Sequence, residues 1–252
     1  MAALRARPLP TPPAMRYGTA TMHEDDLILP PPPAPPPPCA TCGKPEDLCL
    51  CASLVPERTR LQLLILQHPQ EQDVELGTAR LLAGQIENSV IKIGLSWPSL
   101  SKALGRQVEA KRWGVLFMGS KEEVAKVPRG GIAVFGRKDV APDSDLILSD
   151  LEGIVLIDGT WAQAKTLWWR NAWMLKLRRI VIHPDFRSAY GNVRKEPRRE
   201  SVSTLEAGAF VYGRLEGDPD LQERLLKPFD VLLDRWRKRR RRPAKAGPPP
   251  AV

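Results

Sequence analysis

The sequence has no long hydrophobic run. No segment of its 252 residues approaches the run of about twenty apolar residues that a membrane helix needs, which excludes a membrane-spanning protein. Residues 1–15 carry arginines but no continuous apolar stretch of signal-peptide length, so we expect a cytoplasmic protein rather than an exported one. Internal repeats are absent too. We therefore expect one globular domain with unstructured ends.

Acidic residues are too few to balance the basic ones. The chain has 38 Lys and Arg against 29 Asp and Glu, a formal net charge of +9. Each Lys or Arg that neutralises a phosphate releases a condensed counterion, so this balance favours a polyanionic partner, either nucleic acid or an anionic membrane surface. Part of the charge stands in a basic run at residues 237–242, which is either a solubilising tail or an RNA contact.

Core-forming residues are scarce at both ends. Proline dominates the stretch before Cys39, and proline fixes φ and has no amide donor, so residues 1–38 are expected to be polyproline-like or disordered. We interpret them as a tether, with a proline-rich ligand for another domain as the alternative. Residues 237–252, basic and then proline-rich, are interpreted as a second disordered end. The domain is therefore expected over residues 39–236.

Between these ends, short apolar runs alternate with longer amphipathic segments, which is typical of an α/β domain with a parallel sheet. The apolar runs predict strands at residues 61–67, 89–93, 114–118, 132–135, 153–158 and 179–183. The amphipathic segments predict helices at residues 73–85, 161–174, 203–212 and 220–237.

Cysteine is rare, and all of it stands in one short stretch: Cys39, Cys42, Cys49 and Cys51. Four thiolates complete the tetrahedral coordination of zinc, so this spacing predicts a structural zinc knuckle over residues 39–52. Two disulfides or a redox pair are the alternatives, and neither suits a cytosolic protein whose thiols stay reduced.

The expected strand over residues 153–158 runs directly into a helix. Its last residue is Asp158, and Gly159, Thr160 and Trp161 follow. Ligands of open α/β sheets gather at the carboxyl ends of strands, and the unpaired amides that begin the next helix suit anionic groups. Asp158 is therefore a candidate catalytic carboxylate. The alternative is that Asp158 or Thr160 only caps the helix and that Trp161 only packs.

Two polar clusters and one basic loop also interrupt apolar surroundings. Gln67 and His68 follow the first expected strand, and residues 203–206 precede an apolar helix. The second cluster equally matches a capping box, and His68 could simply bond to the backbone of its loop. The loop over residues 185–200 mixes aromatic and basic residues that could stack a base and clamp a phosphate backbone, namely Arg187, Tyr190, Arg194, Lys195, Arg198 and Arg199. A solvated mobile loop is the alternative.

Five motifs in this order resemble the DTW-domain family. Asp158-Gly159-Thr160-Trp161 matches the D-x-T-W pattern that names the family. The other matches are the cysteine knuckle, Leu66-Gln67-His68-Pro69 with Glu71, Leu116-Phe117-x-x-Ser120, and Ser203-Thr204-Leu205-Glu206-Ala207, and together they cover about residues 39–235. The chain departs from the family at Pro38, where arginine stands in relatives, and at Met118 and Gly119, where proline is common.

The resemblance implies a tRNA-uridine aminocarboxypropyltransferase, which moves the 3-amino-3-carboxypropyl group of S-adenosylmethionine to N3 of a uridine in tRNA. It also implies a SPOUT-like, knotted α/β fold whose cofactor lies among loops at the carboxyl ends of strands. The residues then expected to bind S-adenosylmethionine are Gln67, His68, Ser120, Gly159, Ser203, Thr204, Leu205 and Glu206. The sequence leaves the oligomeric state open.

Within that reaction, Asp158 is the candidate base. Uridine N3 loses its proton only in mildly alkaline water, so attack at neutral pH needs a base or a stabilising environment. Thr160 is expected to hold Asp158 or the cofactor carboxylate, and Trp161 to stack on uracil or adenine. Two other functions are kept as alternatives: a SPOUT-like RNA methyltransferase with the same cofactor, and a non-catalytic RNA-binding protein with a zinc knuckle.

Overall fold

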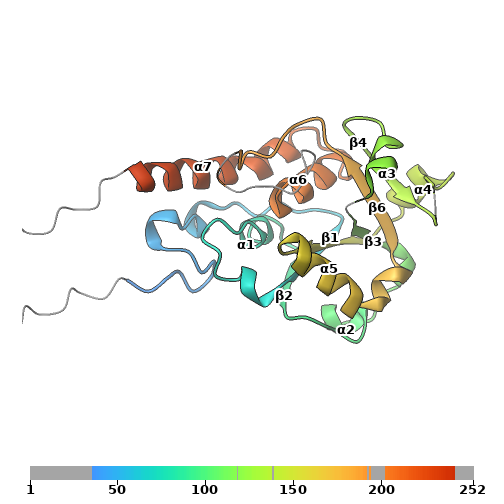
Figure 1. Ribbon diagram of the computed structural model, residues 1–252, viewed down its shortest axis with the longest axis horizontal. Coiled ribbons are helices and arrows are strands. Elements are labelled where there is room, and N and C mark those ends of the chain that lie inside the picture. The colour runs from blue at the N-terminus through green and yellow to red at the C-terminus, as the bar shows by residue number, and fades with distance from the viewer. Residues whose placement is uncertain (1–35, 118, 138, 192, 194–201, 242–252) are drawn as a thin grey trace, which may run out of the picture. The chain divides into compact units, whose positions relative to one another are not determined.

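The fold is built on one six-stranded sheet (Figure 1). The computed structural model describes residues 36–117, 119–137, 139–191, 193 and 202–241. The strands are β1 (Gln62–Gln67), β2 (Ser89–Ile93), β3 (Trp113–Leu116), β4 (Gly131–Phe135), β5 (Gly153–Asp158) and β6 (Arg178–His183). The six predicted strands are confirmed, and their ends differ from the prediction by two residues at most.

One edge of the sheet departs from the expected parallel arrangement. The strand order is β2-β1-β5-β3-β6-β4, and the first five strands pair in parallel. β4 pairs antiparallel with β6, so the expectation of a fully parallel sheet is wrong at this edge. A parallel neighbour needs a crossover that returns the chain to the opposite end of the sheet. Among the described residues between β3 and β4 the only regular element is the short helix α3 (Lys121–Ala125), and β4 then runs back.

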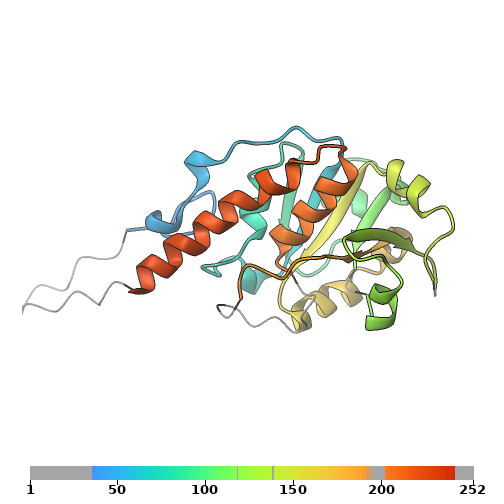
Figure 2. The ribbon, with the colours of Figure 1, turned by 90° about the horizontal axis from the view of Figure 1, so that it is seen from above.

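Helices cover both faces of the sheet (Figure 2). Successive strand residues point to opposite faces, so Leu63 and Ile65 of β1 join one apolar cluster while Leu64 and Leu66 join the other. The helices that supply residues to the first cluster are α1 (Ala79–Ala83), α4 (Ser144–Ser149), α6 (Thr204–Leu215) and α7 (Leu221–Arg241). The second cluster contains residues of α2 (Leu100–Leu104), and α5 (Trp161–Arg170) packs Trp168 against it. The sheet therefore lies between two apolar clusters, one on each face.

Two predicted helices are shorter than expected. Within residues 73–85 the structure forms only α1, and the residues before it form a loop in which Lys44 Nζ donates to the carbonyl oxygens of Glu75 and Gly77, at 2.8 Å each. The helix expected over residues 161–174 ends at Arg170, where the buried Asn171 side chain donates to the Leu167 and Leu95 carbonyls.

The basic run near the C-terminus is helical over most of its length. α7 continues to Arg241, so the expectation that disorder begins at residue 237 is wrong. The rest of the two predicted disordered ends, residues 1–35 and 242–252, lies outside the described residues. Within the described part of the chain, no helix combines the length and the apolar character that crossing a membrane requires.

Candidate active site and metal centre

The candidate carboxylate lies where three separate segments meet. Asp158 ends β5 in register with Gln67, the last residue of the neighbouring β1. The Gln67 side chain donates through Nε2 to Asp158 Oδ2 at 2.8 Å, and the Thr204 hydroxyl donates to Asp158 Oδ1 at 2.5 Å. The backbone amide of His68 also donates to the Asp158 carbonyl at 2.9 Å. The structure thus brings together one residue from each of three predicted motifs.

This site is deeply buried and one of its polar atoms is unsatisfied. Asp158 is 6% exposed and Gln67 is 2% exposed. Gln67 Oε1 meets no hydrogen-bond donor in the described part of the chain. Burying an acceptor without a donor costs about 1–3 kcal/mol, so such atoms usually have a functional explanation. A carboxylate has about four lone-pair positions, and the two donors leave Asp158 with accepting capacity for a ligand.

The residues after Asp158 begin α5. Thr160 is its N-cap: its hydroxyl accepts from the Gln163 amide, and the Gln163 side chain accepts from the Thr160 amide at 2.6 Å. A side chain on Gly159 would lie 2.9 Å from Gln163 Cβ, so this close turn favours glycine. Trp161 follows with 46% of its surface exposed. Thr160 therefore caps the helix and Asp158 does not, and the catalytic role expected of Thr160 stays a prediction.

The start of α6 carries the other half of the site. Ser203 caps the helix, and the 2% exposed Glu206 accepts from the Ser203 amide at 2.7 Å. Glu206 also accepts from the Ser188 hydroxyl and the Ala189 amide, which ties the preceding loop to the helix. The side chain of Leu205 is fully buried in the core and its amide donates to Thr78 Oγ1, and its predicted contact with the cofactor stays a prediction.

Two further predicted cofactor residues act as local caps. Ser120 caps α3 in a capping box with Glu123, and Glu123 in turn binds Arg179 at 2.7 Å. His68 accepts from the Gln70 amide through Nδ1, at 3.3 Å. Their contacts with a ligand stay predictions.

The predicted RNA-binding loop is only partly described. Arg187 is exposed, but the ring of Tyr190 is buried, packs edge-on against Phe229 with ring centres 5.0 Å apart, and donates its hydroxyl to the Leu76 carbonyl. The expectation that Tyr190 stacks on a base is wrong, because neither face of the ring is open. The remaining predicted contacts lie outside the described residues: Arg194, Lys195, Arg198 and Arg199.

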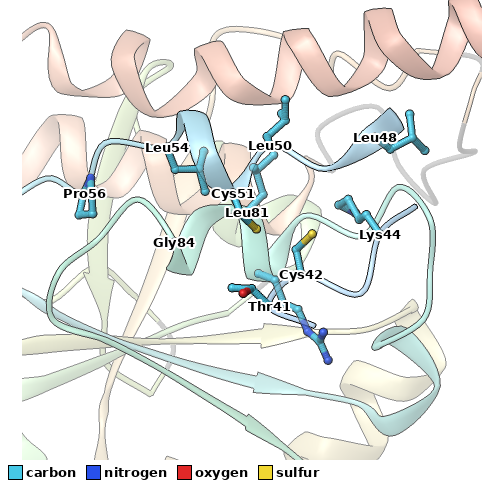
Figure 3. Close-up of a pocket in the computed structure, with 11 residues that line it drawn as sticks. Thr41, Cys42, Lys44, Leu48, Leu50, Cys51, Leu54, Pro56, Leu81 and Gly84 are labelled. Carbon is cyan, nitrogen blue, oxygen red and sulfur yellow. The ribbon is translucent and has the colours of Figure 1, made fainter. Parts of the chain in front are cut away.

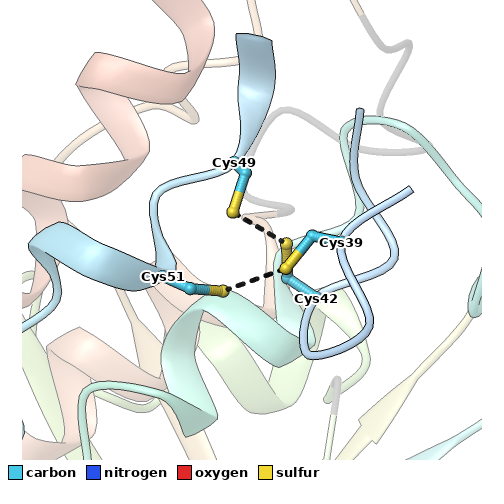
Figure 4. A group of neighbouring side chains, drawn as sticks. All are labelled: Cys39, Cys42, Cys49 and Cys51. Atoms are coloured by element: carbon cyan, nitrogen blue, oxygen red, sulfur yellow. Dashed lines mark hydrogen bonds between the residues drawn. The ribbon is translucent and has the colours of Figure 1, made fainter. Parts of the chain in front are cut away.

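The cysteine cluster has the dimensions of a metal site (Figure 4). All four Sγ atoms lie within 4.8 Å of one another, with 3.9 Å between Cys39 and Cys51 and 3.7 Å between Cys42 and Cys49. Sulfurs bound to zinc at about 2.3 Å stand about 3.8 Å apart in a tetrahedron, whereas a disulfide needs about 2 Å. The geometry therefore fits four ligands around one cation, and the four cysteines form no disulfide in this structure.

The surroundings of the cluster lower the pKa of one cysteine thiol and raise the pKa of two others. The amides of Cys42 and Thr41 hold the pKa of the Cys39 thiol at about 6, which favours the thiolate that metals bind. Burial raises the pKa of Cys42 and Cys51. A bound cation would supply the positive charge that ionises these two thiols.

Comparison with known proteins decides the family. A family model described as the DTW domain matches residues 36–237. The chain belongs to the DTW domain family. Relatives named tRNA-uridine aminocarboxypropyltransferase 2 are 29% identical in Macaca fascicularis, over 196 residues, and in Mus musculus, over 198 residues. In both cases the match covers 77% of this chain and 61% of the relative, so the chain spans about three fifths of their length.

A plant relative matches over more of its length. The Arabidopsis thaliana protein named tRNA-uridine aminocarboxypropyltransferase A is 26% identical over 229 residues, which is 83% of this chain and 84% of the relative. No solved structure matches this chain significantly.

The DTW domain of this chain also contains a residue that sequence reasoning missed. Lys44, only 4% exposed, lies two residues after Cys42 and binds the loop before α1. Burial lowers the pKa of its ammonium, while the negative charges of Cys42 and Glu75 oppose that shift. The sequence does show a lysine inside the cysteine knuckle, which could have marked this position. Its contacts could not be predicted, because its partners lie more than thirty positions away along the chain.

A cavity of about 170 Å³ lies between the knuckle and α1 (Figure 3). It is lined by apolar side chains, including Leu50, Leu54 and Leu81, together with Lys44 and Cys42. Asp158 does not line it. The cavity therefore belongs to the knuckle and its packing against α1, and the candidate carboxylate lies elsewhere.

Proposed function

We propose that this protein is a tRNA-uridine aminocarboxypropyltransferase that uses S-adenosylmethionine and gives 3-(3-amino-3-carboxypropyl)uridine and methylthioadenosine. The observation that carries the proposal is the convergence of Asp158, Gln67 and Thr204, one from each of three family motifs, at the carboxyl ends of β1 and β5. The names of the relatives support the same reaction and the same RNA substrate.

The residues around Asp158 suit S-adenosylmethionine. Its methionine moiety carries an ammonium group, and Gln67 Oε1 is a buried acceptor with no donor among the described residues. We assign Gln67 and Asp158 to hold N–H groups of the ligands, with Ser203 and Thr204 at the start of α6 beside the methionine carboxylate. The sulfonium supplies an electrophilic carbon in the group to be transferred.

The proposed step assigns each residue one task. Thr204 and Gln67 hold the Asp158 carboxylate, which takes the proton from uridine N3. The bond from N3 to the γ-carbon forms as the carbon–sulfur bond breaks, and methylthioadenosine leaves. Transfer of this group rather than the methyl group depends on which carbon stands in line with N3, so selectivity is a matter of orientation. Trp161, partly exposed beside the site, is assigned to stack on the uracil.

The identity of the metal ion and the topology of the chain are two further points of the proposal. We propose that the ion in the four-cysteine cluster is a structural zinc, because four thiolates leave it no open position for chemistry. A knotted, SPOUT-like topology stays a prediction from the family resemblance.

The test is incubation of purified protein with S-adenosylmethionine and an unmodified tRNA transcript, followed by nucleoside mass spectrometry. We expect uridine to gain about 101 Da; a gain of about 14 Da would instead identify a methyltransferase, and no change together with measurable tRNA binding would favour a non-catalytic RNA-binding protein.

The Asp158→Asn variant tests the assigned base. We expect it to bind tRNA normally but to lose transfer at neutral pH, because Asn cannot take the proton, and to regain rate at alkaline pH, where uridine N3 ionises by itself. A wild-type transfer rate in the variant at neutral pH would show that Asp158 is not the base.

A further inference from the structure

One face of α5 exposes large aromatic side chains to solvent. Three residues at intervals of four share one side of this helix: Trp161, Lys165 and Trp169. We call these three residues the α5 ridge. Trp169 is 73% exposed, Trp161 is 46% exposed and Lys165 is exposed, whereas Leu167, on the opposite side of the helix, is fully buried. Tryptophan is highly buried on average, so two exposed rings on one short helix need an explanation.

The segment that contains the ridge carries charge of one sign. Residues 159–184 include Lys165, Arg170, Lys176, Arg178 and Arg179 but no Asp or Glu. Arg170 and Lys176 are exposed like Lys165. Exposed aromatic rings among cations bind single-stranded nucleic acid by stacking on bases while the cations neutralise phosphates. A second copy of this chain would instead bring the same positive face, from a chain of net charge +9, against itself.

The spacing of the two rings restricts the kind of RNA that fits. Eight residues of helix separate Trp161 from Trp169 by about 12 Å along the axis, which exceeds the 3.4 Å between stacked bases of one strand. The rings therefore suit two splayed bases of a loop rather than neighbours within a helical stack.

We propose that the α5 ridge is a docking surface for unpaired nucleotides of tRNA next to the target uridine. The assignment rests on the proposed function and adds the surface by which the RNA is held. Asp158 is the last residue of β5 and α5 begins three residues later at Trp161, so the ridge starts close to the carboxylate in the chain and leads away from it. Trp169 stacks on a flanking base, and Lys165 pairs with a phosphate between the two rings.

The proposal is tested by measuring the affinity for an unmodified tRNA transcript by fluorescence anisotropy. The measurement is made without S-adenosylmethionine and over a range of salt concentrations. Trp169→Ala is expected to raise Kd roughly 5- to 150-fold with little change in the salt slope, and Trp169→Phe to restore most of the affinity. Lys165→Gln is expected to reduce the slope of log Kd against log salt by about 0.7, the value for one phosphate contact on a single strand.

The controls are Leu146→Ala on α4 and Lys227→Gln on α7, both exposed and both on helices packed against the other face of the sheet. They should leave Kd and slope unchanged. Wild-type affinity in Trp169→Ala, or an effect on self-association alone in sedimentation, would overturn the proposal. Because binding is measured without turnover, a protein that binds through the ridge but transfers nothing would contradict the proposed reaction and leave the docking surface supported.

Discussion

At the scale of single residues, two buried carboxylates have different surroundings. Asp158 accepts hydrogen bonds from two side chains and lies beside the unsatisfied Gln67 Oε1. Glu206 accepts from one hydroxyl and two backbone amides. Asp158 therefore retains capacity for a ligand, and the contacts of Glu206 hold a loop against a helix. Both stand in family motifs, so only their partners distinguish them.

We expect Thr204→Val to lower kcat by about tenfold or more while the protein stays folded, because the carboxylate loses one of its two orienting donors and small misplacements are costly in rate. Steady-state nucleoside formation measures the change. Thr166→Val is the matched control, since the Thr166 hydroxyl only bonds back to the Ala162 carbonyl of its own helix. Equal rates for the two variants would argue against a positioning role.

We expect Glu206→Ala to lower the free energy of unfolding by about 2–4 kcal/mol, because it leaves the buried amide of Ser203 and the half-buried amide of Ala189 without an acceptor. Urea denaturation measures this change. Glu109→Ala, at an exposed position, should stay within about 0.5 kcal/mol of wild type. A similarly small change in Glu206→Ala would show that the contacts are replaced by solvent.

At the scale of elements, the cysteine knuckle is joined to the rest of the domain by side chains that bind backbone carbonyls. Lys44 binds the carbonyls of Glu75 and Gly77, and Arg235 of α7 donates to the Cys49 carbonyl at 2.8 Å. Arg239 of α7 binds Glu75 at 2.6 Å, so the same short loop meets both the knuckle and the last helix. Loss of the knuckle should therefore also destabilise the loop before α1 and the packing of α7.

We expect Cys42→Ser to lower both the zinc content and the thermal stability, because metal binding to a four-thiolate site is coupled to folding. Elemental analysis and thermal unfolding of the same preparation measure the two effects. Thr41→Ser, next to the ligand and exposed, is the control and should keep one ion per chain. Stable wild-type protein without any bound metal would contradict the structural site.

At the scale of the whole molecule, the domain that carries the site begins at residue 36. The DTW match starts there, and the described core residues form one compact unit from that point on. We expect removal of residues 1–35 to leave the urea midpoint and the transfer rate at wild-type values. A loss of stability in the shortened chain, with transfer measured in parallel, would show that the proline-rich segment contributes to the fold.

Strand positions were predictable because each strand is specified by a local run of residues. Leu63 to Leu66 alternate between two faces, and their apolar character is visible without knowing what covers them. The short helices α2, α3 and α4 were missed because one or two turns carry too little periodicity. The motif at Ser203 was ambiguous because a capping box and a ligand site use the same residues.

The sequence by itself determined the α/β class, the four-cysteine metal pattern and the family. All three follow from short local patterns of residues and from the order of these patterns along the chain. Only the tertiary structure decided which polar residues meet. The Gln67–Asp158 hydrogen bond joins residues 91 positions apart, and the Thr204–Asp158 bond joins residues 46 apart. Such contacts depend on strand register and on how α6 packs, and burial of Tyr190 and Leu205 is set in the same way. Local patterns do not contain that information, because it arises from packing between distant segments.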